Sequence, residues 1–278
     1  MTMNLAEQRL HDRILSAQKF LWRSLGVMGI ERDEAADPEH SGFIGVKQSI
    51  ITTKPGSLSA KQCSTDPLWG VQFMRWFGEL RVYAGDKVVV SASSSFPAMV
   101  YACLAACETL GLKVIFMLSL GSSSWGANRE GMNFAGMLEL LRRGAFLKTR
   151  PSLYTLGGTN ENADGMDDES KTLLQGNVSD DELVKGLTLD ELVALKSEYL
   201  SGARVLINIG GNASSMGMNV MTLPLPPGIV LPAKNIDGGN GLAGNALKAG
   251  VPVINIREVK VLADKCGIHF RYRRLIKS

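Results

Sequence analysis

Glycine, serine and asparagine gather in four short segments of the sequence, and these residue types together can bind an anion. The segments are S-A-S-S-S-F-P (91–97), S-L-G-S-S-S-W-G-A-N (119–128), I-G-G-N-A-S-S-M-G-M-N (209–219) and N-I-D-G-G-N-G (235–241). Glycine lets backbone N–H groups approach a ligand closely, and consecutive N–H groups in a turn can surround an anion. Serine and asparagine side chains add uncharged hydrogen-bond donors. These residues suit a carboxylate or a phosphate.

The residues expected to contact such a ligand are the small and polar members of these segments. They are Ser93, Ser95, Gly121, Ser123, Ser124, Trp125, Asn128, Gly210, Gly211, Asn212, Asp237 and Gly238. The alternative is that glycine and serine only form the tight turns that join strands to helices. That alternative is the simpler interpretation of any single segment, whereas the four taken together favour a ligand site.

A serine nucleophile is a second way in which the same residues could do chemistry. Ser93 or Ser94 would lie on a turn between a strand and a helix, and Asp237 and His269 follow in the hydrolase order of nucleophile, acid and base. The glycines of G-x-S-x-G are absent, however, and His269 lies in a basic tail. A serine-dependent hydrolase or transferase is therefore the alternative function.

Titratable groups are few in these segments. Asp237 is the main acid, and Lys54 and Lys61 could reach the site from a loop that precedes a helix. Acid–base catalysis needs a proton acceptor whose pKa suits the working pH. The shortage of such groups favours a binding protein over an enzyme.

No cofactor and no metal are expected. The chain has neither the glycine spacing of a dinucleotide-binding loop nor the motif G-x-x-x-x-G-K-[ST]. Cys103 and Cys107 lie four residues apart in an apolar helical segment, without a histidine or a third cysteine nearby. Core positions are the expected role of these two thiols, because a structural metal site needs more ligands.

The elements that would position the four segments follow an α/β pattern. Apolar runs at 87–90, 113–118, 204–209 and 251–256 predict strands, and the segments 96–110, 132–143 and 242–249 predict helices. Strands without polar alternation, interleaved with helices, indicate a parallel sheet that is covered on both faces. The fold class is therefore expected to be doubly wound α/β with a mostly parallel sheet. Ligands bind at the carboxyl ends of such strands, which is where the segments would meet.

The chain is expected to form a single α/β domain over 1–278. Residues 1–35 would be an N-terminal amphipathic helical extension, with the helix at 5–30, and a further helix would run from Pro67 to about Val82. The acidic, glycine-rich segment 157–178 predicts a mobile surface loop. S-D-D-E (179–182) and T-L-D-E (188–191) match the capping box, so helical structure is expected to resume there and to continue through Leu200.

Charge and hydropathy limit the partners and the compartment. The net charge of the 278 residues is only +3, and the basic cluster is confined to the tail (Arg271, Arg273, Arg274 and Lys277), so no nucleic-acid partner is expected.

The best apolar stretch, 96–107, is shorter than the roughly twenty residues of a membrane-spanning helix. The charged N-terminus does not resemble a signal peptide. A cytoplasmic or peripherally membrane-associated protein is expected.

Five motifs, in the same order along the chain, carry a resemblance to the family of poly-gamma-glutamate system proteins. They are I-I-T-T-K-P-G-S-L-S-A-K (50–61), S-F-P-A (95–98), S-L-G-S-S-S-W-G-A-N (119–128), I-N-I-G-G (207–211) and G-V-P-V-I-N-I (250–256). The resemblance extends from about residue 40 to the C-terminus. Family members tend to carry glycine where Ser91 and Ser94 stand here, and they often begin with a membrane-spanning helix.

The resemblance implies an accessory protein of bacterial poly-γ-glutamate biosynthesis or export. The implied partners are poly-γ-glutamate or an acidic small molecule, together with membrane-bound components of the polymer synthase. Every unit of this polymer carries a free carboxylate, which agrees with a site made of neutral donors. The alternative is a hydrolase or transferase of γ-glutamyl bonds that uses a serine.

Overall fold

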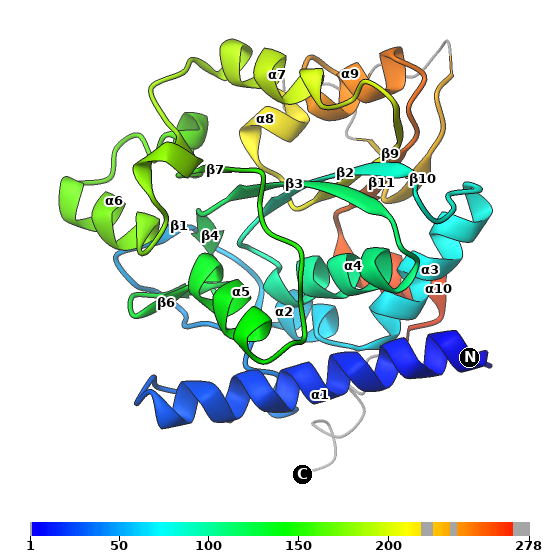
Figure 1. Cartoon of the computed structure of the whole chain (residues 1–278). Helices are drawn as coiled ribbons and strands as arrows, with labels where there is room; N and C mark the ends of the chain where they lie inside the picture. The colour runs from blue at the N-terminus through cyan, green and yellow to red at the C-terminus, as the bar shows by residue number, and fades with distance from the viewer. Residues whose placement is uncertain (1, 218–224, 234–237, 269–278) are drawn as a thin grey trace.

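The computed structural model describes residues 2–217, 225–233 and 238–268, and within them a twisted sheet forms the centre of the molecule (Figure 1). The described residues place seven strands in this sheet. Their order is β10 (Gly228–Val230), β11 (Val253–Ile256), β9 (Ala203–Ile209), β2 (Lys87–Ser93), β3 (Lys113–Ser119), β7 (Leu153–Thr155) and β8 (Leu183–Val184). Only β10 runs antiparallel to its neighbour among these described strands.

One face of the sheet is covered by two layers of helix. Nearly every residue of α4 (Pro97–Thr109) is buried, because this helix lies between the sheet and the outer helix α1 (Leu5–Val27) (Figure 1). The same side holds α2 (Leu58–Ser64), α3 (Leu68–Glu79), α5 (Phe134–Arg143) and α10 (Val259–Cys266). Valines at alternate positions of β2 pack against α4, so the uninterrupted apolar strand is explained by burial on both faces.

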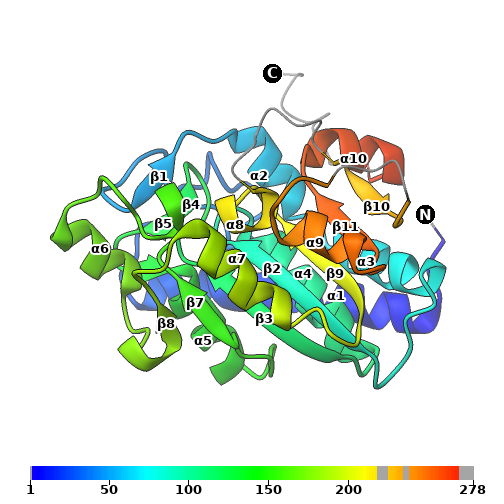
Figure 2. The ribbon, with the colours of Figure 1, turned by 90° about the horizontal axis from the view of Figure 1, so that it is seen from above.

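The other face is covered by α7 (Leu189–Glu198), α8 (Ala213–Met216) and α9 (Leu242–Lys248), which lie in front of the strands in Figure 2. A second apolar cluster joins Val89 and Leu206 of the sheet to Leu242 and Ala246 of α9. Helices on both faces of a mostly parallel sheet confirm the predicted doubly wound α/β fold. The chain leaves β2 toward β3, β7 and β8 and then returns to the other side of β2 through β9 and β11, so the strand order reverses between β2 and β9.

Helix α1 packs on α3, α4 and α5 along an apolar stripe that includes Leu10, Ile14 and Leu21. A capping box begins the helix: Asn4 Oδ1 accepts from Glu7 N (2.9 Å), and Glu7 Oε2 accepts from Asn4 N (2.9 Å). The predicted N-terminal amphipathic helix is therefore confirmed over Leu5–Val27.

The structure contains several short strands that the sequence did not predict. β1 (Thr52–Lys54) pairs with β4 (Ser122–Ser123), and β5 (Asn128–Arg129) pairs with β6 (Met132–Asn133). β10 is also unpredicted, and β11 begins two residues later than the apolar run at 251 suggests. Pro67 lies just before α3, where the Asp66 carboxylate accepts from Leu68 N (2.9 Å).

The prediction of a loop at 157–178 is wrong in its secondary structure. Residues Thr159–Glu161 form a 3₁₀ turn (η1) and Asp168–Gln175 form α6, whose first turn is capped by Asp167. The Glu161 side chain is 1% exposed, although the composition around it is that of a surface loop.

The prediction of helix from residue 179 is also wrong, because a single 3₁₀ turn (η2, Asp180–Glu182) leads into β8. The capping box of Thr188 and Glu191 is confirmed at the start of α7.

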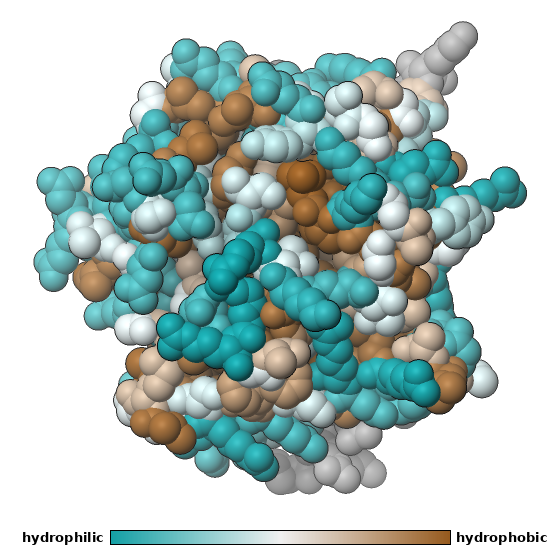
Figure 3. All heavy atoms as spheres, viewed as in Figure 1, coloured by the Kyte–Doolittle hydropathy of each residue, from teal (hydrophilic) through white to brown (hydrophobic). Residues whose placement is uncertain are grey.

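No helix within the described ranges is both long enough and apolar enough to cross a bilayer. On the face seen in Figure 3, hydrophobic residues are scattered among hydrophilic ones. The basic tail residues Arg271, Arg273, Arg274 and Lys277 lie outside the described part of the chain.

Truncating the apolar stripe of α1 should destabilise the whole fold. Leu21 is fully buried, so Leu21→Ala is expected to lower the free energy of unfolding by about 2–5 kcal/mol. Leu5→Ala is the matched control, because Leu5 lies on the same helix and is 67% exposed. Urea denaturation of both variants measures the difference. Equal effects of the two substitutions would show that α1 is not part of the cooperative core.

Candidate functional site

Three of the four polar segments meet where β2, β3 and β9 end, and we call this region the carboxyl edge. Ser94, just after β2, donates both its backbone N–H and its Oγ to Ser119 O at the end of β3 (2.9 Å each). Gly210, just after β9, lies so close to β2 that an added Cβ would stand 2.5 Å from Ser93 Oγ. Segments that are far apart in the sequence therefore form one continuous edge.

The fourth segment is described only in part. Its last residue, Gly241, lies against Gly217 at the end of α8, so this segment also adjoins the carboxyl edge. Gly238 packs closely against Gly244 of α9, which gives it a packing role. Asp237 and His269 lie outside the described residues. The triad that includes them therefore stays a prediction.

Most of the hydroxyl groups at the carboxyl edge bond to the protein itself. Ser122 Oγ donates to Ser94 O (3.1 Å), and the hydroxyls of Ser91 and Ser215 pair with each other (2.8 Å). Ser95 Oγ accepts from Ser123 N (3.1 Å). These bonds join β2 and the turn after it to β4 and α8, so the hydroxyls hold these elements together.

Asn128 has a structural role that uses its whole side chain. Its Oδ1 accepts from Val46 N (3.0 Å), and its Nδ2 donates to Val46 O (2.9 Å) and to Thr52 Oγ1 (2.8 Å). The side chain thereby holds the segment 46–52 against the carboxyl edge. No donor of Asn128 is left for a ligand.

Three further residues that were predicted to contact a ligand instead make close backbone contacts within the protein. Gly121 packs against the backbone of Gly158, where a Cβ would stand 2.6 Å from the amide nitrogen. Ser124 N donates to Lys54 O (2.9 Å), and Trp125, whose φ is +64°, donates its N–H to Val46 O (2.8 Å). The amides of Ser124 and Trp125 are thus hydrogen-bonded within the protein and are not free to bind an anion.

Asn212 and Ser93 are among the predicted residues with a side-chain polar atom that has no partner among the described residues. Asn212 begins α8, and its Oδ1 accepts from Ser215 N (3.2 Å), which leaves its buried Nδ2 without an acceptor. Ser93 Oγ also makes no hydrogen bond within the described ranges. Both residues lie where the strand order reverses, between β2 and β9, and this is the position at which doubly wound folds bind ligands.

Arg257 is a cation at the same edge that the sequence patterns did not single out. It directly follows β11 and is half-buried, and a Cβ on Gly211 would lie 3.9 Å from its Nε. Within the described part of the chain it has no carboxylate in ion-pair range. The sequence did contain a signal for Arg257. This residue directly follows the last predicted strand, and three of the four polar segments also follow predicted strands.

A buried carboxylate joins the strands beside this site. Glu161 accepts from Ser119 Oγ (2.8 Å) on β3, Thr155 Oγ1 (2.6 Å) on β7 and Ser214 Oγ (2.6 Å) on α8. Lys196 of α7 lies 3.8 Å from the same carboxylate and donates to Ser214 Oγ (2.6 Å). A single side chain thus connects two strands with two helices.

The opposite charges of Glu161 and Lys196 offset the unfavourable effect of burial on each other. Burial alone would raise the pKa of the Glu161 carboxyl, but the Lys196 ammonium and the hydroxyl donors outweigh burial and hold that pKa below its ordinary value. Burial lowers the pKa of Lys196, and the nearby carboxylate opposes this shift. Glu161 itself has a φ of +64°, a strained conformation for a residue with a side chain. Such strain persists only where the surrounding contacts outweigh it.

Lys61, on α2, is a second buried cation at the carboxyl edge. Its Nζ donates to Ser95 O and to Ser123 Oγ (2.9 Å), and it lies 3.7 Å from the centre of the Phe96 ring. Burial, with a smaller effect of the Lys54 charge, lowers the pKa of Lys61 to about 7. The expectation that Lys61 could reach the polar segments agrees with this geometry.

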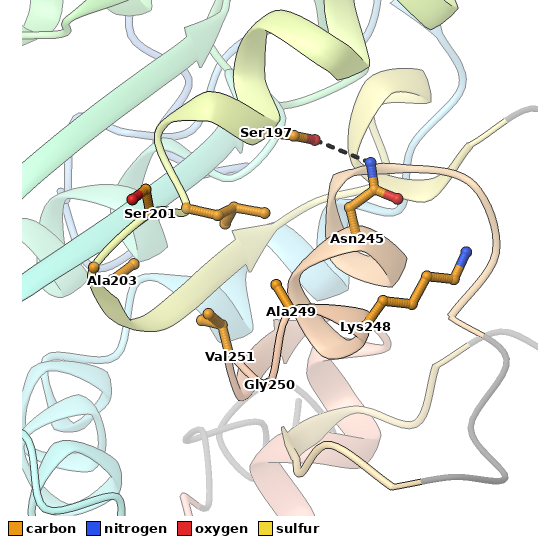
Figure 4. A pocket seen from close by; sticks show the side chains of 10 residues that line it. Ser197, Ser201, Ala203, Asn245, Lys248, Ala249, Gly250 and Val251 are labelled. Carbon is orange, nitrogen blue, oxygen red and sulfur yellow. Dashed lines mark hydrogen bonds between the residues drawn. The ribbon is translucent and has the colours of Figure 1, made fainter.

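A cavity of about 660 Å³ lies away from these groups (Figure 4). It is formed between the end of α7 and α9, where Ser197 Oγ accepts from Asn245 Nδ2 (3.0 Å), and it also includes Ala203 at the start of β9. The cavity therefore opens at the amino ends of the strands. Its lining lacks the unpaired donors that distinguish the carboxyl edge.

No protein-family model, curated protein or solved structure matches this chain. The resemblance to poly-gamma-glutamate system proteins therefore stays a prediction.

Removing the positive member of the buried pair should be costly. Lys196→Met leaves the Glu161 charge buried without its counter-ion, and we expect the free energy of unfolding to fall by about 3–5 kcal/mol. Lys185→Met is the matched control, because Lys185 pairs with Asp180 (2.7 Å) in an exposed position. Chemical denaturation compares the two variants. A loss for Lys196→Met no greater than that of the control would contradict a stabilising role for the pair.

The Glu161 carboxylate should also make the free energy of unfolding depend on pH in the acid range. Its pKa is lowered in the folded protein, so its contribution is complete above its unfolded pKa of about 4.3 and is lost as the pH falls through the lower folded value. Denaturation of the wild type and of Glu161→Gln at pH values from about 6 down to 3 measures this contribution. The stability difference between the two proteins should shrink toward pH 3. A difference that stays constant would mean that folding does not lower the pKa of Glu161.

Proposed function

We propose that this protein binds a carboxylate-bearing ligand at the carboxyl edge, where Ser93, Asn212 and Arg257 supply the contacts. The observation that carries the proposal is that Asn212 Nδ2, Ser93 Oγ and the Arg257 guanidinium lack partners among the described residues and lie near the reversal of strand order. Most of the other hydroxyls of the edge bond to the protein itself. A folded protein leaves few buried donors unpaired, and a ligand is one reason for doing so.

The chemistry of these groups suits an acidic ligand. A guanidinium group can hold a carboxylate through two parallel hydrogen bonds. The amide of Asn212 is oriented by its bond from Ser215 N, so its Nδ2 is ready to donate. Gly210 and Gly211 carry no side chains that would keep a ligand from the backbone. One half-buried cation with neutral donors also avoids the large desolvation cost of a fully buried ion pair.

We propose poly-γ-glutamate, or an acidic precursor of it, as the ligand, and an accessory role in the biosynthesis or export of this polymer. The support is the resemblance of the sequence motifs together with the chemistry of the edge. A γ-linked glutamate chain presents a carboxylate on every unit, so one well-placed arginine can bind any unit along its length. Membrane-bound synthase components are the proposed protein partners.

Removing the Arg257 charge should weaken binding. We expect Arg257→Gln to raise the Kd for oligo-γ-glutamate at least tenfold in isothermal titration calorimetry, since a charge-assisted hydrogen bond contributes about 1.5–3 kcal/mol. Added salt should weaken wild-type binding because it screens the partly exposed charge.

Arg204→Gln is the control, because Arg204 is an exposed arginine at the opposite end of the sheet. Equal weakening by the two substitutions would indicate a general charge effect. Absence of wild-type binding to oligo-γ-glutamate, citrate and phosphate would remove the basis of the proposal.

A further inference from the structure

Lys61 and Ser123 form a close pair of a basic and a hydroxyl side chain. Lys61 is 2% exposed, and its ammonium has no carboxylate in ion-pair range among the described residues. It lies 2.9 Å from Ser123 Oγ, which is within hydrogen-bond distance for proton transfer. The remaining contacts of Lys61 are Ser95 O and the face of the Phe96 ring. These two contacts fix the position of the amine beside the serine.

The hydrogen-bonding of the pair differs between the two protonation states of Lys61. A protonated amine has three hydrogens, and Ser95 O, Ser123 Oγ and the Phe96 ring would take all of them. The Ser123 hydroxyl hydrogen would then have no acceptor among the described residues. A neutral amine has a lone pair that can accept this hydrogen. Because the pKa of Lys61 lies at about 7, both states are populated near neutral pH.

We propose that Ser123 is a nucleophile and Lys61 its general base, and that this pair catalyses acyl transfer from an ester or an amide. Nucleophilic serines need an adjacent base, and lysine is a known alternative to histidine in that role. The proposal does not depend on the anion site beside Arg257, because it involves different side chains.

The reaction is balanced without a cofactor. Ser123 Oγ attacks the substrate carbonyl carbon while its proton moves to Lys61 Nζ. The tetrahedral intermediate collapses, the bond to the leaving alcohol or amine breaks, and Lys61 gives the proton to that leaving group. Water, or an acceptor amine, then attacks the acyl-serine with Lys61 again taking and returning a proton. This second step releases the acyl group and restores both side chains.

Gly56 lies beside the Ser123 hydroxyl. Ser123 is almost buried, whereas Gly56 is exposed. A Cβ at position 56 would stand 2.9 Å from Ser123 Oγ, so an exposed residue without a side chain adjoins the hydroxyl and gives a substrate its approach. The nearby Lys54 favours acyl compounds that carry a negative charge.

A fluorophosphonate probe, which forms a covalent bond with activated serines, tests the pair in the intact protein. Peptide mass spectrometry is expected to find the label on Ser123. The labelling rate should rise with pH through about 7, because only neutral Lys61 can accept the proton. Lys61→Arg keeps a cation in place but cannot act as a base near neutrality, so we expect the rate to fall roughly 100-fold or more. Gly56→Ala should also slow labelling, since its Cβ crowds the hydroxyl.

Ser122→Ala is the matched control, because Ser122 is a buried neighbour whose hydroxyl donates to backbone carbonyls and has no basic partner. It should leave the labelling rate unchanged, and thermal denaturation should show that each variant is folded. A folded wild-type protein that takes no label on Ser123 would overturn the proposal. Labelling that is unaffected by Lys61→Arg would equally overturn it and would leave Lys61 as a structural anchor. Neither result bears on the binding of oligo-γ-glutamate.

Discussion

The buried carboxylate of Glu161 is the interaction on which the carboxyl edge depends. A charge that is removed from water must be surrounded by donors, and here the donors come from β3, β7 and α8, with Lys196 of α7 as the counter-ion. Satisfying one side chain therefore fixes the relative positions of elements that are distant in the sequence. The left-handed backbone of Glu161 shows that these contacts outweigh local strain.

The serines at this edge consequently have two different roles. Ser94, Ser119 and Ser122 bond to neighbouring backbone or to Glu161, so they hold the strands in place. The proposed functions use groups that this network does not engage. These are Ser93, Asn212 and Arg257 at the reversal of strand order, and the pair of Lys61 and Ser123 beside it. A rigid network of satisfied hydroxyls is a suitable support for such groups, because binding sites require fixed positions.

The sequence predicted the central strands, the main helices and the edge at which polar residues meet, because uninterrupted apolar runs and helical periodicity report burial directly. It did not predict β7, β8, β10 or the short strand pairs, whose few residues carry no periodic signal. Glu161 was missed because burial of a carboxylate depends on donors contributed by other segments, and the surrounding composition is that of a surface loop. The same limit applies to Asn128. The sequence shows that an asparagine could bind a ligand, but it does not show that the side-chain donors of Asn128 already bond to Val46 and Thr52.

The central claim is that an acidic ligand takes up the unpaired donors at the carboxyl edge, and side-chain amide resonances report this most directly. In a ¹H–¹⁵N spectrum of the labelled protein, addition of oligo-γ-glutamate should shift the Nδ2 resonance of Asn212, whose amide lacks an acceptor among the described residues. The Asn128 resonance should stay in place, since both of its donors are already bonded. An Asn212 resonance that does not move at saturating ligand would contradict the claim.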